Sequence, residues 1–134
     1  AWSEGNVDRL IVRPNRRLNR RREFRMFFKD GQLKAVSQYN LDRHFVSLEE
    51  RREEIWQRAQ EFAAKVGPRL PVPTVVVDVY LTAGRQFMII DLNSWGAPTD
   101  PKLLKSWERD WNEVAGLRLI PKPVKLKGDV KVSF

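Results

Sequence analysis

The sequence has no cysteine and a single histidine, His44, among its 134 residues. The absence of cysteine excludes disulfide bonds and thiolate metal sites, and a lone histidine excludes a metal site built from several imidazoles. No apolar run approaches the ~20 residues needed to span a bilayer, and the first residues lack the pattern of a signal peptide. These absences lead us to expect a soluble, cytoplasmic protein with no membrane partner.

Two segments carry charge of mainly one sign. The net charge is +8 and the pI is ≈ 10.2. Residues 9–25 contain eight arginines and one acid, Glu23, and residues 117–134 are again basic. Such segments favour anionic partners but do not fix the chemistry. For the arginine cluster from Arg16 to Arg22, three interpretations stay open: polyphosphate binding, nucleic-acid binding and a solvated loop.

Two acids occupy facing positions in a predicted hairpin. Strand-like runs between residues 74 and 92 flank Gly84-Arg85, a sequence typical of a two-residue type II′ loop. This loop would place Asp78 opposite Asp91, and the alternation of side chains would put Asn93 on the same face. Facing like charges destabilise a sheet. A hard cation such as Mg²⁺ between them would remove the conflict, because magnesium takes oxygen ligands.

A second hairpin is predicted around Asp30-Gly31, a strong type I′ turn sequence. In the register set by a two-residue loop, Glu23 faces Gln38 and Arg25 faces Val36. The side chains of Glu23, Arg25 and Gln38 would then share one face of the sheet. A cross-strand hydrogen bond between Glu23 and Gln38 is a structural alternative to a role in ligand binding.

Two helices are predicted. The first starts with the capping-box pattern Ser47–Glu50, continues with apolar residues at helical spacing to Val66, and ends at Gly67-Pro68. The second starts at Asp100-Pro101 and carries an apolar stripe that reaches Trp111.

The strands form local hairpins, and a further short strand is expected at residues 9–13, before Pro14. Without clear parallel βαβ units, the sequence predicts an α+β fold in which an antiparallel sheet of hairpins packs with two helices. We expect one domain over residues 1–116. A basic tail follows at residues 117–134, and whether it packs on the same domain is left open.

Residues 23–111 resemble the C-terminal half of the cell division cycle protein 123 family, which comprises divergent ATP-grasp proteins. The resemblance rests on motifs in the same order and approximate spacing: Glu23-Phe24-Arg25, Gly31-x-Leu33, Ser37-Gln38, Val77-Asp78-Val79-Tyr80, Ile90-Asp91-Leu92-Asn93, Trp95-Gly96 and Thr99-Asp100. The chain departs from the family pattern at Ser94, where proline is usual, and at Tyr39, where arginine is usual. An ATP-grasp site lies between two subdomains, and the first subdomain, which supplies a phosphate-binding lysine, is not recognised in this sequence.

The resemblance implies a fold like the C-terminal subdomain of ATP-grasp proteins, and binding of ATP with Mg²⁺. Asp78, Asp91 and Asn93 would hold the metal. Arg25 would be the catalytic residue, in contact with the phosphates or the transferred group, and residues 10–13 would line the adenine side. The nucleotide-binding set implied in this way comprises Arg13, Glu23, Arg25, Gln38, Asp78, Asp91 and Asn93.

The first functional hypothesis is therefore a magnesium-ATP-binding, ATP-grasp-like domain. It would belong to a carboxylate–amine ligase, in which ATP activates a carboxylate for attack by an amine, or to an ATP-dependent assembly factor. Eukaryotic members of the family help to assemble translation initiation factor 2, which implies a protein partner. Whether the chain catalyses a reaction alone stays open. Two alternatives remain: a non-catalytic interaction module with a decayed nucleotide site, and a basic nucleic-acid-binding domain.

Overall fold

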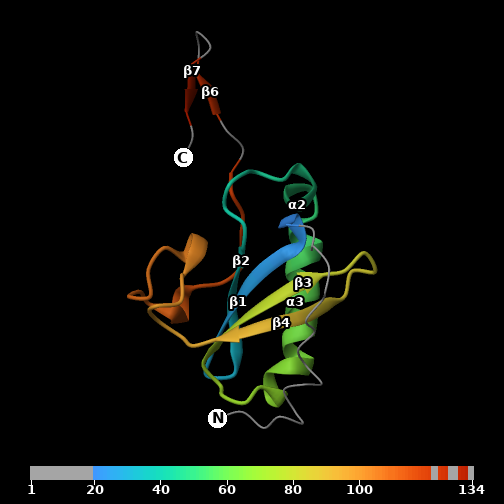
Figure 1. Ribbon diagram of the computed structural model, residues 1–134, viewed down its shortest axis with the longest axis vertical. Coiled ribbons are helices and arrows are strands. Elements are labelled where there is room, and N and C mark those ends of the chain that lie inside the picture. Colours follow the sequence, from blue (N-terminus) through green and yellow to red (C-terminus); the bar gives the residue numbers. More distant parts are fainter. Residues whose placement is uncertain (1–19, 122–123, 127–129, 133–134) are drawn as a thin grey trace.

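The structure, a computed structural model, describes residues 20–121, 124–126 and 130–132 (Figure 1). The strand expected at residues 9–13, including Arg13, lies outside the described residues. The strands are β1 Glu23–Lys29, β2 Gln32–Gln38, β3 Val75–Leu81, β4 Phe87–Asn93, β5 Leu117–Arg118, β6 Val124–Leu126 and β7 Val130–Val132. The helical elements are α2 Val46–Glu50 and α3 Arg52–Val66, with the 3-10 turns η1 Arg20–Arg22, η2 Gly67–Arg69, η3 Lys102–Leu104 and η4 Trp111–Glu113.

A five-stranded sheet in the order β4-β3-β1-β2-β5 organises the described chain. Its neighbouring strands are antiparallel except β2 and β5, which pair in parallel. Strands β6 and β7 form a separate antiparallel pair. The sheet includes β5, which begins at Leu117, so the segment expected to be a tail contributes an edge strand. The predicted α+β fold is confirmed, with one main helix, α3, beside a mostly antiparallel sheet.

The hairpin of β1 and β2 has the predicted turn but a shifted register. Asp30 and Gly31 both have positive φ, 54° and 79°, as a type I′ turn requires. A bulge then changes the pairing between Phe27 and Phe28, because Lys34 is an extra residue on β2. The expected register was therefore wrong beyond the bulge. Arg25 pairs with Ser37 instead of Val36, and Gln38 pairs with Phe24 instead of Glu23.

The hairpin of β3 and β4 reaches the predicted pairing by a different route. The expected two-residue type II′ loop is wrong, because the turn spans Thr82 to Gln86 and its left-handed residue is Arg85, at φ 62°. This longer loop alone would shift the register by one residue. A bulge at Ile90 shifts it back, so Asp78 pairs with Asp91 as predicted.

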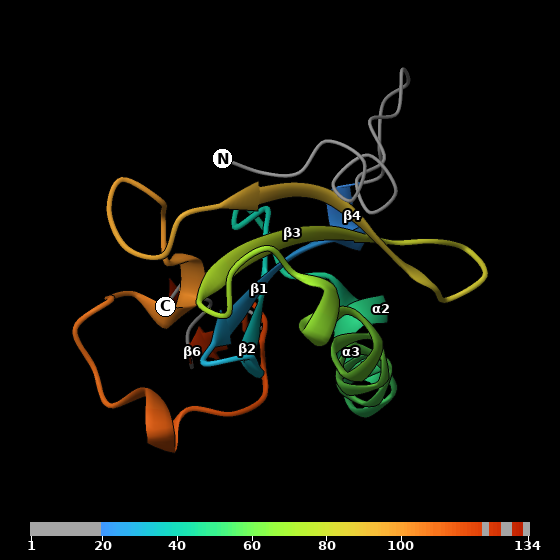
Figure 2. The ribbon, with the colours of Figure 1, turned by 90° about the horizontal axis from the view of Figure 1, so that it is seen from below.

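The two faces of the sheet bury different side chains. Helix α3 lies along one face (Figure 2), which carries the alternate apolar residues Phe24, Met26, Phe28, Val75, Val77 and Val79. On the other face, Phe27 is fully buried in a second cluster with Val76, Leu104 and Trp111, and Trp95 and Trp107 pack against it. Each fully buried apolar side chain contributes about 1.5–3 kcal/mol, so both faces stabilise the sheet. The second face also buries the polar residues Arg25, Ser37 and Asp78.

The first predicted helix exists and ends at Val66 as predicted, but its start and its continuity differ from the prediction. It consists of α2 and α3, which are separated at Arg51 by a non-helical backbone conformation, φ −108° and ψ 17°. The expected capping box is wrong, because Phe45 is the N-cap residue and no side chain caps the helix. Gly67 has a right-handed helical conformation instead of the left-handed one expected after a helix. Its absent side chain serves a close approach, since a Cβ there would lie 3.2 Å from the carbonyl oxygen of Gly31.

The second predicted helix is wrong, because the structure has two 3-10 turns, η3 and η4, in this segment. Asp100 does accept a hydrogen bond from the backbone N–H of Lys102, at 2.8 Å, as a cap would. Positive φ at Lys102 and Lys105, 52° and 67°, then prevents a regular helix. The tryptophans instead surround Phe27. The indole N–H of Trp107 donates to the carbonyl of Thr99, at 2.8 Å.

Within the described residues, no helix has the length and apolar character needed to cross a membrane.

The aromatic cluster predicts a distinctive effect of Phe27→Ala. The Phe27 ring lies 5.6 Å from that of Trp107 and 5.7 Å from that of Trp111, centroid to centroid. Loss of the ring leaves a cavity, so the free energy of unfolding should fall by about 3–5 kcal/mol. Urea denaturation measures this fall, and near-ultraviolet circular dichroism should show a reduced tryptophan signal, because three tryptophans pack around Phe27.

Phe28→Ala is the matched control, because Phe28 is equally buried but belongs to the cluster under α3. It should destabilise the protein by a similar amount and retain most of the tryptophan signal of the folded state, because three of the four described tryptophans belong to the cluster around Phe27 instead. An unchanged tryptophan signal in Phe27→Ala would contradict the packing described here.

Candidate functional site

A buried ion pair lies at the centre of the polar part of the sheet. Arg25 of β1 and Asp78 of β3 are cross-strand partners. The Arg25 Nε donates to Asp78 Oδ1 at 2.8 Å, and Nη2 donates to Asp78 Oδ2 at 3.0 Å. The two residues are only 6% and 4% exposed. The planar guanidinium thus holds both carboxylate oxygens, in the two-bond arrangement that arginine forms best.

Arg25 also ties the loop after β4 to the sheet. Its Nη1 donates to the backbone carbonyl of Asp100 at 2.7 Å. Its guanidinium carbon lies 5.1 Å from the centre of the Tyr39 ring, and Lys102 Nζ lies 4.2 Å from the same centre. Burial lowers the pKa of Arg25, but the hydrogen bonds and charge of Asp78 outweigh it and leave the pKa raised. Arg25 therefore stays charged at every relevant pH.

Asp91 and Asn93 approach the pair from the neighbouring strand, β4. Asn93 Nδ2 donates to Asp78 Oδ2 at 2.8 Å. Asp91 lies across from Asp78 in the ladder and is exposed. One of its oxygens, Oδ1, accepts a hydrogen bond from the backbone N–H of Leu92 at 2.9 Å. Asp78, Asp91 and Asn93 therefore share one face of the sheet, as the spacing predicted.

In the structure, Asp78 has a counter-ion, Arg25, that the prediction of a metal between Asp78 and Asp91 did not include. Facing acids need positive charge between them, and the Arg25 guanidinium already neutralises Asp78. The facing acids alone therefore do not require a metal, and the metal-binding role of Asp78, Asp91 and Asn93 stays a prediction. In the described part of the chain, no cluster of three or more His, Cys, Asp or Glu residues suits a metal, so any site here combines two carboxylates with an amide.

The remaining oxygen atoms fit a hard cation. Asp91 Oδ2 and Asn93 Oδ1 accept no hydrogen bond from the described residues, and Asp78 Oδ1 accepts one. All three are oxygen donors of the kind that Mg²⁺ prefers, and Mg²⁺ commonly keeps several waters as further ligands. Asn93 is oriented by the hydrogen bond from its Nδ2 to Asp78, which leaves its carbonyl oxygen for a ligand.

Glu23 and Gln38, the two remaining predicted residues that the structure describes, differ in position. Glu23 is on the same face as Arg25, two residues away on β1, and accepts a hydrogen bond from Asn40 Nδ2 at 3.3 Å. Gln38 is on the opposite face, beside Phe24. Its amide donates to the carbonyls of Asn40, at 2.6 Å, and Arg43, at 2.9 Å, and accepts from the N–H of Ile120 at 3.0 Å. The structure therefore does not bring Gln38 to the site.

Sequence reasoning missed four residues that border the site: Ser37, Tyr39, Asp100 and Lys102. Ser37 accepts a hydrogen bond from the backbone N–H of Leu103 at 3.1 Å and so helps Arg25 to fix the loop. Ser37 and Tyr39 alternate along the chain, so a correct register would have revealed them. No local pattern indicates that the loop at Asp100 folds back onto β1.

Two matched substitutions test whether Asp78 stabilises the fold more than the exposed Asp91 does. Asp78→Asn removes the charge that balances buried Arg25, so the free energy of unfolding should fall by about 3–5 kcal/mol. Asp91→Asn changes an exposed carboxylate and should alter it by only about 0.5 kcal/mol, in either direction, since it also relieves repulsion. Chemical denaturation of both variants measures the difference. Equal losses would contradict the assignment of the buried pair.

Tyr39 provides a test of the same electrostatics at high pH. Burial, followed by the charge of Asp78, raises the pKa of Tyr39 above its ordinary value, and Arg25 opposes this only partly. A raised pKa in the folded state means that folding binds the phenolic proton more tightly. The contribution to stability is complete below about pH 10 and is lost as the pH rises further.

Ultraviolet titration of tyrosinate should thus show one phenol that ionises late. Tyr39→Phe should remove this late transition. It should also reduce the loss of stability above about pH 10. A late transition that persists in Tyr39→Phe would contradict the described environment of Tyr39.

The sequence of this chain is similar to a known protein family and to several named proteins. The protein family described as D123 matches residues 3–127. Cell division cycle protein 123 of Candida glabrata is 30% identical over 114 residues, which cover 84% of this chain and 30% of that protein. An Aspergillus oryzae protein named translation initiation factor eIF2 assembly protein is 37% identical over 100 residues, covering 73% of this chain and 24% of that protein. The chain thus spans less than a third of the length of these two relatives.

Solved structures agree with the sequence comparison. C-terminally truncated Cdc123 from Schizosaccharomyces pombe superposes with a TM-score of 0.66 at 29% sequence identity, over 80% of this chain and 43% of that one. A second structure of Cdc123 from the same organism gives a TM-score of 0.63 at 28% identity. The match over residues 3–127, together with these relatives, shows that the chain belongs to the D123 family, the family of cell division cycle protein 123.

Proposed function

We propose that this chain carries the magnesium-nucleotide face of an ATP-grasp-like assembly factor. Two lines of support meet here: membership of the D123 family, and the arrangement of Arg25, Asp78, Asp91 and Asn93 on one face of the sheet. The observation that carries the proposal is the contrast between the two paired acids. Asp78 is buried and held by Arg25, whereas Asp91 is exposed and keeps an oxygen for a ligand.

Each residue has a distinct part in this proposal. Asp91 and Asn93 offer carboxylate and amide oxygens to Mg²⁺, and Asp78 adds Oδ1 while its hydrogen bond fixes the Asn93 amide. Arg25 positions Asp78. Three of its five N–H groups are used in the observed bonds, so two remain for a phosphate oxygen. Lys102, which lies over the Tyr39 ring, adds positive charge at the border of the site.

Bound magnesium-ATP would supply the phosphoryl group that is transferred, and Mg²⁺ would neutralise part of the negative charge of the phosphates. The chain itself contributes oriented oxygen atoms and two fixed cationic side chains, which favour the developing charge on the phosphate. The described residues hold no pair of side chains arranged as a nucleophile and its base. Any reaction would therefore depend on positioning and electrostatics, and Arg25 is the residue proposed to act on the transferred group.

The partner proposed for the whole protein follows from a relative's name. The Aspergillus oryzae protein is named for assembly of translation initiation factor eIF2. We extend this role to the present chain: a cytoplasmic contribution to the assembly of an eIF2-type complex, through a protein contact. Co-elution with purified eIF2 subunits in size-exclusion chromatography tests this extension. Failure to co-elute with any subunit would oppose it and leave the nucleotide proposal intact.

The nucleotide proposal predicts a selective effect of Asp91→Asn. Isothermal titration with ATP should show binding that requires Mg²⁺, and the variant should bind at least about tenfold more weakly. ATP without metal should bind both proteins equally, because the loss concerns a metal ligand.

Asp110→Asn is the matched control, because Asp110 is an exposed acid that caps η4 and asparagine caps equally well. It should bind magnesium-ATP like the wild type. Absence of magnesium-dependent binding in the wild type would favour the interaction module with a decayed site. Affinity for random oligonucleotides that falls steeply with salt, at any magnesium concentration, would favour the nucleic-acid-binding alternative.

A further inference from the structure

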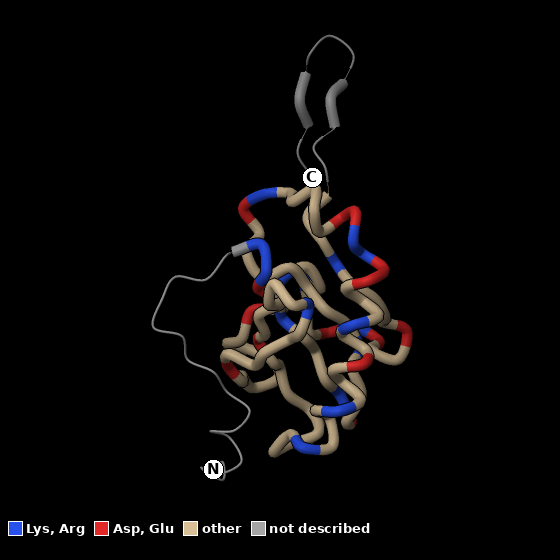
Figure 3. Tube along the Cα trace, turned by 90° about the vertical axis from the view of Figure 1, so that its right-hand side faces the viewer, with Lys and Arg blue, Asp and Glu red and all other residues tan. Residues whose placement is uncertain are grey.

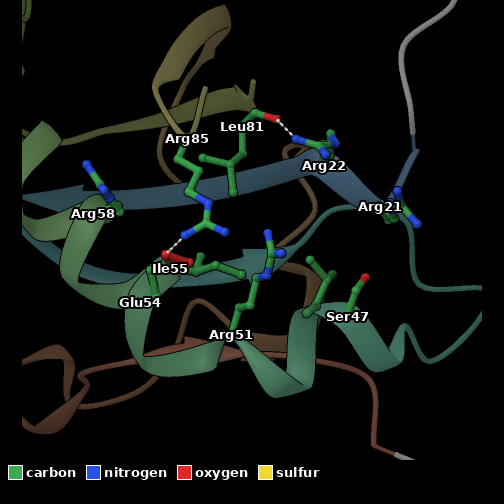
Figure 4. Close-up of a pocket in the computed structure, with 10 residues that line it drawn as sticks. Arg21, Arg22, Ser47, Arg51, Glu54, Ile55, Arg58, Leu81 and Arg85 are labelled. Atoms are coloured by element: carbon green, nitrogen blue, oxygen red, sulfur yellow. Dashed lines mark hydrogen bonds and ion pairs between the residues drawn. The ribbon is translucent and has the colours of Figure 1, made fainter. Parts of the chain in front are cut away.

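A second site lies on the other side of the sheet, where an arginine-rimmed groove separates the helices from the β3–β4 hairpin. Figure 4 shows its first cavity, which lies between η1, the α2–α3 junction and the turn at Arg85. Leu48, Ile55 and Leu81 form its apolar floor. These side chains belong to or pack against the cluster under α3, so the groove is separate from the face that carries Asp78.

Arginine dominates the rim of this cavity. Positive and negative residues are interspersed along most of the described chain (Figure 3), but five arginines and one acid line the cavity: Arg21, Arg22, Arg51, Arg58, Arg85 and Glu54. No lysine lines it. The planar guanidinium of arginine binds two oxygen atoms of a carboxylate or phosphate through two parallel hydrogen bonds, which lysine cannot do. The lining thus favours carboxylates or phosphates.

Two of these arginines are available for a ligand. Arg85 pairs with Glu54, and Arg22 Nη1 donates to the carbonyl of Leu81 at 3.2 Å. The side chains of Arg51 and Arg58 make no ion pair or hydrogen bond within the part of the chain that the structure describes. Figure 4 shows Arg51 reaching from the helices, and Arg85 from the hairpin, toward the same space. The one acid of the rim is therefore already neutralised, and net positive charge faces the cavity.

The groove is elongated. The first cavity, of ≈ 140 Å³, adjoins a second of ≈ 100 Å³, and both are lined by Arg58 and Arg85. The second continues along α3 toward Lys65. A single small anion would fill neither the length of this groove nor its apolar floor. An extended segment with an apolar side chain and flanking acids would use both.

The lining also distinguishes a protein from a nucleic acid. Single-stranded nucleic acids bind through aromatic side chains that stack on the bases. The first cavity has no aromatic lining residue. In the second, Phe62 and Phe87 pack against each other, with ring centroids 5.7 Å apart, and Phe87 is only 8% exposed. Their faces are therefore engaged with the core.

We propose that this groove is the docking site for an acidic segment of a protein partner, with an aliphatic residue on the floor at Ile55 and carboxylate or phosphorylated side chains on Arg51 and Arg58. This mode of binding, acidic groups on an arginine cluster, recurs in peptide recognition. The inference does not depend on the nucleotide site, because it uses none of the residues on the Asp78 face.

The test uses fluorescence anisotropy with a labelled probe peptide, a single leucine flanked on each side by aspartates. The protein should bind it saturably, and affinity should decrease as salt increases. Replacement of the probe's leucine by serine should weaken binding several-fold, and replacement of its aspartates by asparagine should abolish binding. A second probe with phosphoserine in place of one aspartate distinguishes phosphate from carboxylate as the preferred group.

The double variant Arg51→Gln/Arg58→Gln should weaken binding of the leucine probe about tenfold. Arg51→Lys/Arg58→Lys keeps the charge but loses the planar fork, and should fall between the wild type and the glutamine variant. Arg69→Gln/Arg118→Gln is the matched control, because both residues are exposed and lie outside the groove; it should bind the probe like the wild type. Circular dichroism verifies that each variant is folded.

Several results would overturn the inference: no saturable binding of the leucine probe by the wild type, equal losses in the groove variant and its control, or equal affinity for the leucine and serine probes. An oligothymidylate of equal charge that binds more tightly, with the same dependence on Arg51 and Arg58, would assign the groove to nucleic acid instead.

Discussion

The buried pair of Arg25 and Asp78 is the interaction on which the rest of the candidate site depends. It joins the two central strands of the sheet, and through the carbonyl of Asp100 it also holds the loop that follows β4. Buried ion pairs add little net stability, because desolvation offsets their attraction, but loss of one partner is costly. The pair is thus better understood as a positioning device. It fixes the Asp78 carboxylate, which in turn orients the Asn93 amide.

The sequence predicted much of this arrangement, and the errors have physical causes. The Asp78–Asp91 pairing was correct although the loop was wrong, because the longer turn and the bulge at Ile90 cancel. The bulge at Lys34 had no such compensation, so Gln38 was assigned to the wrong face. Turn sequences are local and can be recognised, whereas bulges depend on how the finished sheet packs. The partner of Asp78 was missed because β1 and β3 are far apart in the sequence, and no local pattern indicates that these two strands pair.

The tryptophan-rich segment shows a different limit. Its apolar spacing was compatible with a helix, and Asp100 does bond to the first turn as a cap would. The segment instead packs its rings around Phe27 and changes direction at Lys105. Tertiary packing overrides local propensity in such segments. The consequence is functional, because the irregular path brings the Asp100 carbonyl and Lys102 to the site, where a regular helix would carry its carbonyls in internal hydrogen bonds.

The sheet therefore separates two proposed activities. The face with Asp91 would hold a metal nucleotide, and the opposite side offers the groove beside α3 to a protein segment. Strands β1 and β3 connect the two proposed sites. The turn η1 leads directly into β1, and Arg22 of η1 donates a hydrogen bond to the carbonyl of Leu81 at the end of β3. Because the two proposed sites lie on opposite sides of the sheet, the two proposed ligands would not compete for the same surface.

The central claim is that the Asp78 face, held by Arg25, is where the metal nucleotide binds. The most direct measurement is paramagnetic broadening of backbone amide signals in an NMR titration with Mn²⁺-ATP, because broadening reports distance from the metal itself. The account predicts that signals of Asp78, Asp91 and Asn93 broaden first, before those of Arg51 and Arg58 in the groove. Broadening that begins at the groove arginines, or that is uniform across the protein, would contradict it.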